Sequence, residues 1–241
     1  MSDYFIYGGV NSATFRARVF PTDSMLKAPA HKYSEVVVPG RSGKLLMDLA
    51  SYDNIRREYD VQIFGDSDLA AFNALRNYLA SCTGYLRLTD SFDPDHYYMA
   101  AYTEAFNLTA DWHSRKRGRG TISFDCKPQR FLISGETAVV KTSSDTITNP
   151  TRFASKPLLR VTTTRSAASV LGVGSVNVTI RRQGVIFIDC ETGRAYNGAT
   201  PLDTYVSLNA IDFPTLEPGS NGISLGTGIS RVEITPRWWE L

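Results

Sequence analysis

Short stretches of alternating apolar and polar residues, repeatedly interrupted by Gly and Pro, constrain the fold of this chain most strongly. Three stretches alternate most clearly, at 121–126, 176–180 and 232–235. In the first, Ile122, Phe124 and Cys126 share one face. A period of two residues predicts strands with one buried and one solvated face, as in antiparallel sheets, and frequent turn residues are typical of a β-sandwich.

Two stretches depart from this alternation. Residues 185–188 are apolar on both faces, which predicts a central strand. Residues 68–81 carry apolar side chains at helical spacing, and these are Leu69, Phe72, Leu75 and Leu79. Ser67 can cap the first turn, and Gly84 lies just past the end. We therefore expect one amphipathic helix whose apolar stripe packs on a sheet.

The length and a change in composition indicate two domains. A chain of 241 residues suffices for one large or two modest domains. After Glu136 the sequence becomes rich in Thr, Ser, Gly and Val, and it contains no convincing helix. We place the boundary near Gly135, giving an N-terminal domain at 1–134 and a C-terminal β-sandwich at 135–241.

The charge and the N-terminal sequence argue against several classes of partner. The 26 basic and 24 acidic residues give a net charge of +2, which supports neither a nucleic-acid nor a membrane partner. The first residues lack the basic and apolar regions of a signal peptide, and no stretch approaches the ~18 apolar residues of a membrane span. We expect a soluble protein.

The residues that usually carry chemistry do not assemble into a recognisable site. Cys82, Cys126 and Cys190 are too few and too scattered for a disulfide framework or a zinc site, so buried reduced thiols are expected. The three histidines lie far apart. Residues 90–95 hold three carboxylates, but Pro94 favours a tight turn over a calcium loop. We predict no catalytic residue, no cofactor and no metal, and therefore no enzyme.

The densest basic run comprises Arg115, Lys116, Arg117 and Arg119. Gly118 and Gly120 can provide turn conformations, so we interpret the run as the tip of a hairpin. Such a tip can contact phosphate or remain a solvated loop, and both interpretations stay open.

A second unusual stretch begins at Val38 with the sequence VPGRSG and contains no residue pattern that suits catalysis. Its Pro and Gly residues predict a turn-rich entry to a strand at 44–49. An exposed strand or hairpin of this kind is a template for pairing with another chain.

Several sequence pieces, in this order, resemble the distal tail proteins (Dit) of phages with long non-contractile tails and of their prophages. The pieces are 5–9 (FIYGG), 38–43 (VPGRSG), 84–88 (GYLRL), 93–100 (DPDHYYMA), 124–130 (FDCKPQR), 149–151 (NPT), 188–191 (IDCE), 213–221 (FPTLEPGSN) and 236–239 (PRWW). They extend over the whole chain. Each is weak alone, and their combination and order carry the resemblance.

The resemblance implies a structural protein of the virion, made in the cytoplasm of the host bacterium. Such proteins form hexameric ring hubs at the distal end of the tail. One face docks on the tail tube protein, and the other receives the tail-associated tip protein. The implied fold is mainly β, with a sandwich-like N-terminal domain carrying one helix and a protruding hairpin, and a galectin-like C-terminal β-sandwich. That second domain can carry receptor-binding proteins, and DNA only passes through the lumen of the ring.

This resemblance gives the two unusual stretches a hypothetical role. We expect the stretch from Val38 to contribute to the contact between subunits, through Val38, Pro39, Gly40, Arg41, Gly43, Leu45 and Met47. The alternative is an ordinary hairpin within one domain. The basic run would then face the channel or an adjacent ring.

The alternative function is a carbohydrate-binding module of a host-recognition device, for which Tyr196 and Tyr205 are the candidate aromatic residues.

Trp238 and Trp239 are expected to pack against a core or an interdomain surface.

Overall fold

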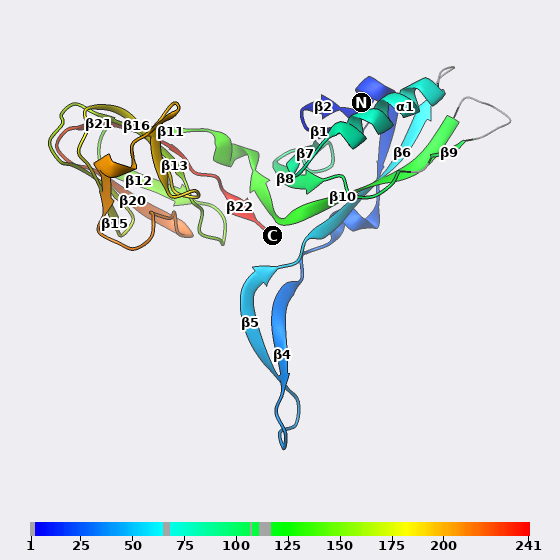
Figure 1. Cartoon of the computed structure of the whole chain (residues 1–241), viewed down its shortest axis with the longest axis horizontal. Coiled ribbons are helices and arrows are strands. Elements are labelled where there is room, and N and C mark those ends of the chain that lie inside the picture. Colours follow the sequence, from blue (N-terminus) through cyan, green and yellow to red (C-terminus); the bar gives the residue numbers. More distant parts are fainter. Residues whose placement is uncertain (1–2, 65–67, 107, 111–116) are drawn as a thin grey trace. The chain divides into compact units, whose positions relative to one another are not determined.

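The computed structural model describes residues 3–64, 68–106, 108–110 and 117–241. The chain is mainly β, as the sequence predicts, and it divides into two compact units (Figure 1). The first comprises 1–130 with Leu241, and the second comprises 131–240. The boundary near Gly135 stays a prediction.

The first unit is built on one twisted sheet. Its strands are β1 (Phe5–Tyr7), β2 (Val10–Asn11), β3 (Ala17–Pro21), β6 (Ile55–Phe64), β7 (Leu86–Asp90), β8 (His96–Ala101), β9 (Leu108–Ala110) and β10 (Arg117–Leu132), in the order β2-β1-β7-β8-β10-β6-β3, with β9 on β10. Two short 3-10 helices, η1 (Ser12–Phe15) and η2 (Asp23–Leu26), flank β3. The predicted alternation at 121–126 is confirmed, because Ile122, Phe124 and Cys126 are all fully buried.

The predicted helix forms as α1 (Asp68–Ser81). Leu75 and Leu79 are fully buried, and Phe72 packs against the same core. Leu69 departs from the prediction, because its side chain in the first turn is 71% exposed. The predicted cap, Ser67, lies outside the described residues.

A buried ion pair crosses the core of the first unit. Arg57 on β6 donates from Nη2 to Oδ2 of Asp90 at 2.7 Å, and the two side chains are 3% and 2% exposed. The Tyr59 hydroxyl donates to the same oxygen at 2.6 Å, and the Arg57 guanidinium lies 4.5 Å from the Tyr98 ring centroid. Burial raises the pKa of the Tyr59 hydroxyl well above its ordinary value, so this hydroxyl stays a donor.

The acidic stretch at 90–95 forms a turn, as expected. Oδ1 of Asp90 accepts from the backbone N–H groups of Phe92 at 3.0 Å and Asp93 at 2.9 Å. Asp93 in turn contacts Nδ1 of His96 at 2.6 Å. Asp90 therefore both shapes the β7–β8 turn and neutralises the buried arginine.

The second unit is a sandwich of two sheets around one core. One sheet contains β11 (Val139–Lys141), β21 (Ile229–Thr235), β13 (Leu158–Thr163), β16 (Gly184–Asp189), β17 (Arg194–Asn197) and β18 (Thr200–Pro201), in that order. The other contains β12 (Asp145–Asn149), β20 (Gly219–Leu225), β14 (Ser169–Val173), β15 (Val176–Ile180) and β19 (Val206–Leu208). The remaining elements are η3 (Ile133–Glu136), η4 (Asp203–Tyr205) and β22 (Trp239–Glu240).

Two predictions for this unit are confirmed. Trp238 belongs to the core and is 5% exposed, as expected, while the Trp239 ring stacks on Phe153 at 4.5 Å. β16 is an interior strand, as predicted from 185–188, but only one of its faces is buried in the core. On its other face Phe187 stacks against Tyr196, and the Arg160 guanidinium lies 5.8 Å from the Phe187 ring centroid, so the prediction of a central strand is confirmed.

Asn149 holds two loops of the second unit together. Its amide nitrogen donates to the carbonyls of Phe153 and Leu216, each at 2.9 Å, and its Oδ1 accepts from Thr151 N at 2.9 Å. The residue is 2% exposed, so water cannot replace these bonds. Replacing Asn149 by Ala should cost about 3 kcal/mol, since it leaves several buried polar groups unpaired.

Thermal unfolding of the variant checks this value. The matched control is Asn197→Ala, which removes one exposed amide bond to the Val185 carbonyl and should change stability by less than about 1 kcal/mol. Equal effects of the two substitutions would contradict the role assigned to Asn149.

Candidate assembly interface

A two-stranded arm is separate from the three larger sheets. β4 (His31–Val37) pairs only with β5 (Lys44–Tyr52) among the described strands, and Figure 1 shows the pair extending away from the sheet of the first unit. The turn at 38–43 joins them, and Gly40 and Gly43 have φ values of 80° and 83°. Such values favour glycine, which explains the spacing of the two glycines in the turn.

The register of the arm defines two faces. Val36 pairs with Leu45 and Ser34 with Met47, so these four side chains lie on one face. We call Val36, Leu45 and Met47, with Ser34 between them, the apolar face. The opposite face carries Val37 and Leu46 together with charged side chains, because Val37 pairs with Lys44 and Glu35 with Leu46.

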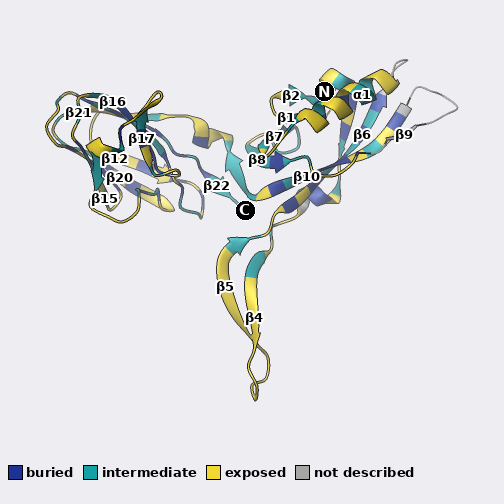
Figure 2. Ribbon diagram, in the orientation of Figure 1, coloured by how far each residue is buried: buried dark blue, intermediate teal, exposed yellow. Residues whose placement is uncertain are grey.

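The arm concentrates the exposed apolar surface of the described chain. Met47 is 53% exposed, Leu46 57% and Val37 73%. Of fifteen exposed large apolar residues, eight lie between 33 and 49, and these are Tyr33, Val36, Val37, Val38, Leu45, Leu46, Met47 and Leu49. Figure 2 shows β4 and β5 exposed over most of their length. An isolated hairpin of this kind is marginally stable in water, so its apolar surface fits a docking role.

Both lysines of the arm strands are paired with carboxylates. Lys44 forms an ion pair with Glu35, and Lys32 Nζ lies 3.0 Å from Asp53 Oδ1. These pairs are exposed and contribute little to stability. Because these lysine charges are already paired, we expect any docking of the arm to depend on apolar contact and to respond weakly to salt.

A bulge lies at the root of the arm. The register shifts between His31 and Tyr33, and Ala50 adopts φ 49°, which is unusual for a residue with a side chain. Asp48 Oδ1 accepts from Ala50 N at 2.7 Å and lies 3.3 Å from His31 Nδ1. The bulge twists the arm where it leaves the body of the first unit.

The seven residues that sequence reasoning proposed for a subunit contact all lie on this arm. Val38, Pro39, Gly40, Arg41 and Gly43 form the turn, and Leu45 and Met47 share the apolar face. The sequence-based prediction did not include β4, which carries Val36 and Tyr33. The β-branched run Val36–Val38 immediately before a Pro-Gly turn was the signal for that second strand. The role of these residues in assembly stays a proposal.

The basic run is only partly described. Arg115 and Lys116 lie outside the described residues, as does the connection between β9 and β10. Arg117 begins β10, and Arg119 Nη2 lies 3.1 Å from Asp60 Oδ2 at the surface. The prediction that Gly118 and Gly120 supply turn conformations is wrong, because both residues are paired within the sheet with β6 and β9.

The remaining candidate groups show structural environments. Cys126 and Cys190 are buried free thiols, and burial raises the pKa of each to about 12, so neither is a thiolate near neutral pH. Cys82 is only half-buried. Among the described residues, no three His, Cys, Asp or Glu side chains gather as metal ligands. No described helix has the length and apolarity needed to cross a membrane.

Each of the two aromatic residues considered for saccharide binding has one partner on its ring. Tyr196 stacks on Phe187 at 5.7 Å with an interplanar angle of 10°, and Tyr196 also pairs with Pro201 on the neighbouring strand. The Arg182 guanidinium lies 5.5 Å from the Tyr205 ring centroid. Each of these ring contacts covers one ring face, and Tyr205 is 42% exposed, so the carbohydrate-binding alternative stays a hypothesis.

Comparison with solved structures identifies the fold. The crystal structure of SPP1 Dit (gp 19.1), whose authors call it a paradigm of the hub adsorption apparatus in phages infecting Gram-positive bacteria, aligns with a TM-score of 0.75 over 100% of both chains at 16% identity. The protein has the Dit fold. The phage P2 baseplate in its activated conformation aligns over 97% of both chains at 10% identity, with TM-scores of 0.57 with Ca and 0.54 with Sr. No family model and no curated protein sequence matches the chain.

The shared Dit fold confirms the fold class inferred from scattered sequence pieces. The alignment with SPP1 Dit covers both units, so the resemblance is not limited to the more common sandwich. At 16% identity the agreement concerns the backbone arrangement, and the roles of individual side chains must be argued from this chain.

Proposed function

We propose that this protein is the hub of a phage tail, a ring of six copies at the distal end that joins the tail tube to the tip and receptor-binding apparatus. The observation that carries the proposal is the arm, with exposed apolar side chains on both faces and internally paired charges. The Dit fold supports the same role, since the solved neighbours are hub and baseplate proteins.

The physical argument for a ring begins with the arm's exposed surface. Apolar surface of this size in a soluble protein marks an interaction site. If each copy docks its apolar face on the next, the contact joins two different surfaces, and such head-to-tail contacts close into rings when the rotation permits. The arm would then serve assembly, and no catalytic step is required of the chain.

The proposed partners follow from that position. The tail tube protein would contact one face of the ring and the tail-associated tip protein the other, while DNA passes through the lumen during ejection. Receptor-binding proteins would attach to the second unit. The protein would therefore reside in the virion, at the tail tip.

Negative-stain electron microscopy of the purified protein tests the proposal. We expect closed rings with a central hole and six-fold symmetry in the class averages. Open filaments or only compact single particles, at concentrations where the protein is fully soluble, would argue against a self-closing ring.

A further inference from the structure

Three loops meet at one end of the sandwich in the second unit. They are residues 164–168, 181–183 and 226–228, which follow β13, β15 and β20. The last residue of β13 pairs with the first residues of both β16 and β21, and these two strands directly follow the other two loops. The register therefore places the three loops side by side, and together we call them the arginine end.

Hydrogen bonds hold these loops to one another. Thr164 N donates to the Gly228 carbonyl at 2.8 Å, which joins the first loop to the third. The Thr163 hydroxyl donates to the Arg182 carbonyl, which joins the end of β13 to the second loop. Side chains on the arginine end are therefore carried by a fixed backbone frame.

The arginine end takes its name from Arg165, Arg181 and Arg182. Among the described residues, no carboxylate oxygen lies within 4.0 Å of these three guanidinium groups. Other arginines of the same unit are paired, as Arg237 is with Asp189 at 2.7 Å. The three loops also contain no Asp or Glu, so this end presents uncompensated positive charge.

Each of the three guanidinium groups is positioned by a neutral partner. Arg181 Nη1 donates to the Ser207 hydroxyl at 3.0 Å, and Arg165 Nη2 donates to a backbone carbonyl of its own loop at 2.6 Å. The Arg182 guanidinium lies 5.5 Å from the Tyr205 ring centroid. A guanidinium has five N–H donors, so these contacts orient the groups and leave donors for an anion.

The chemistry of the loops suits phosphate better than a folded protein. Thr164, Ser166 and Thr227 are exposed, and their hydroxyl groups can donate to phosphate oxygens. None of the three loops contains a large apolar residue, whereas protein interfaces depend on buried apolar or aromatic anchors. Stacking of nucleic-acid bases needs aromatic platforms, and among the described aromatic residues Tyr205 alone contacts these arginines.

We propose that the arginine end binds the phosphate groups of a flexible phosphodiester chain. Arg165, Arg181 and Arg182 would each pair with a phosphate, and the loop hydroxyl groups would donate to the remaining oxygens. This binding is separate from assembly through the arm and does not rest on the ring, because every residue that it uses belongs to the second unit.

Three short probes of equal charge test the proposal on the full chain. We expect an oligomer of glycerol phosphate and a single-stranded DNA oligonucleotide to bind within about threefold of each other, because only their phosphates are recognised. A glutamate peptide should bind about tenfold more weakly, since its carboxylates end flexible side chains that must be ordered on binding. Fluorescence anisotropy gives the three dissociation constants.

Removing two of the arginines should weaken binding without unfolding the protein. Arg181→Gln combined with Arg182→Gln should raise the dissociation constant for the glycerol phosphate oligomer at least about tenfold and reduce its salt dependence. The melting temperature should hardly change, because neither side chain belongs to the core. The matched control is Arg152→Gln, an exposed arginine between β12 and β13 at the opposite end of the sandwich, which should change the affinity less than about twofold.

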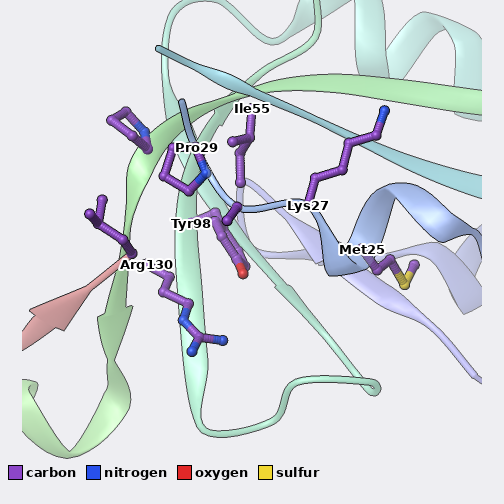
Figure 3. Close-up of a pocket in the computed structure, with 9 residues that line it drawn as sticks. Met25, Lys27, Pro29, Ile55, Tyr98 and Arg130 are labelled. Carbon is purple, nitrogen blue, oxygen red and sulfur yellow. The ribbon is translucent and has the colours of Figure 1, made fainter. Parts of the chain in front are cut away.

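A second control removes a positive charge from the first unit. Lys27 lines a cavity whose walls include Met25, Ile55 and Tyr98, and all the lining residues belong to that unit (Figure 3). Lys27→Gln should leave the affinity for the oligomer within about twofold. If either control weakened binding as much as the double variant, binding would follow the net charge of the protein, and the proposed site would be refuted.

The probes themselves supply the other contrary results. Failure of the glycerol phosphate oligomer to bind at low salt would overturn the proposal. DNA binding more than about tenfold tighter than binding of that oligomer would show that bases are recognised. A glutamate peptide that binds as tightly as the phosphate probes would point to an acidic protein segment instead. None of these results bears on the ring, which particle images and mass test separately.

Discussion

Replacing Leu45 and Met47 together by Asp is expected to abolish assembly while leaving the subunit folded. Both side chains lie on the apolar face of the arm, and they are 40% and 53% exposed in the subunit. Because only about half of each side chain is exposed, burying the rest stabilises the contact by about 1 kcal/mol per residue, so losing both weakens each contact about thirtyfold. The two new carboxylates would also have to be desolvated in an apolar contact, which weakens association further. In a closed ring this loss of binding free energy occurs at every interface.

The measurement is particle mass and thermal unfolding on the same samples. Neither side chain belongs to the core of the first unit, so the melting temperature of the subunit should hardly change. The control is Val170→Asp, which puts the same charge on an exposed apolar position of the second unit that is 39% exposed. Rings of unchanged mass from the double Asp variant would exclude the apolar face from the subunit contact.

Asp90→Asn is expected to be the most destabilising single substitution in the first unit, at about 3–5 kcal/mol. It leaves the Arg57 guanidinium buried without a counter-charge, while Asn can still cap the backbone N–H groups of Phe92 and Asp93 through its oxygen. Most of the loss should therefore come from the unpaired charge. For a domain with 5–15 kcal/mol of total stability, this is a large fraction.

A double-mutant cycle isolates that charge. Asp90→Asn with Arg57→Met removes both charges and should be clearly more stable than Asp90→Asn alone, as measured by chemical denaturation. The exposed pair of Lys32 and Asp53 supplies the comparison, since Asp53→Asn should cost less than about 1 kcal/mol. If the double variant shows the plain sum of the two single effects, the Arg57–Asp90 charges do not act as a pair.

Sequence reasoning succeeded where a local pattern decides the outcome. The alternation that buries Ile122, Phe124 and Cys126 is visible in six consecutive residues, and helical spacing identified Leu75 and Leu79. Leu69 shares that spacing but stays exposed, because a periodic pattern shows which side of a helix is apolar and not how far the covering sheet extends. Phe187 on β16 shows the same limit of a local pattern. The apolar residues beside it in the sequence predict a central strand, but they do not show that only one face of its sheet packs against the core.

Long-range partners and intermolecular surfaces lay beyond sequence reasoning for a different reason. Arg57 and Asp90 are 33 positions apart, and no spacing rule brings them together in a core. The Pro-Gly turn of the arm could be predicted from the sequence, but the exposure of both strand faces could not. Apolar residues that face another molecule have the same sequence pattern as apolar residues that face the core of their own chain. The candidate site could therefore be located from its turn but not outlined.

The mass of the purified protein in solution, measured by light scattering over a range of concentrations, tests the central claim most directly. The account predicts a discrete species of six times 26.7 kDa, about 160 kDa, that dissociates on dilution without unfolding. It should respond weakly to added salt, because Lys44 and Lys32 are already paired with Glu35 and Asp53. A single 26.7 kDa species at every concentration up to the solubility limit would contradict a ring that this chain closes unaided.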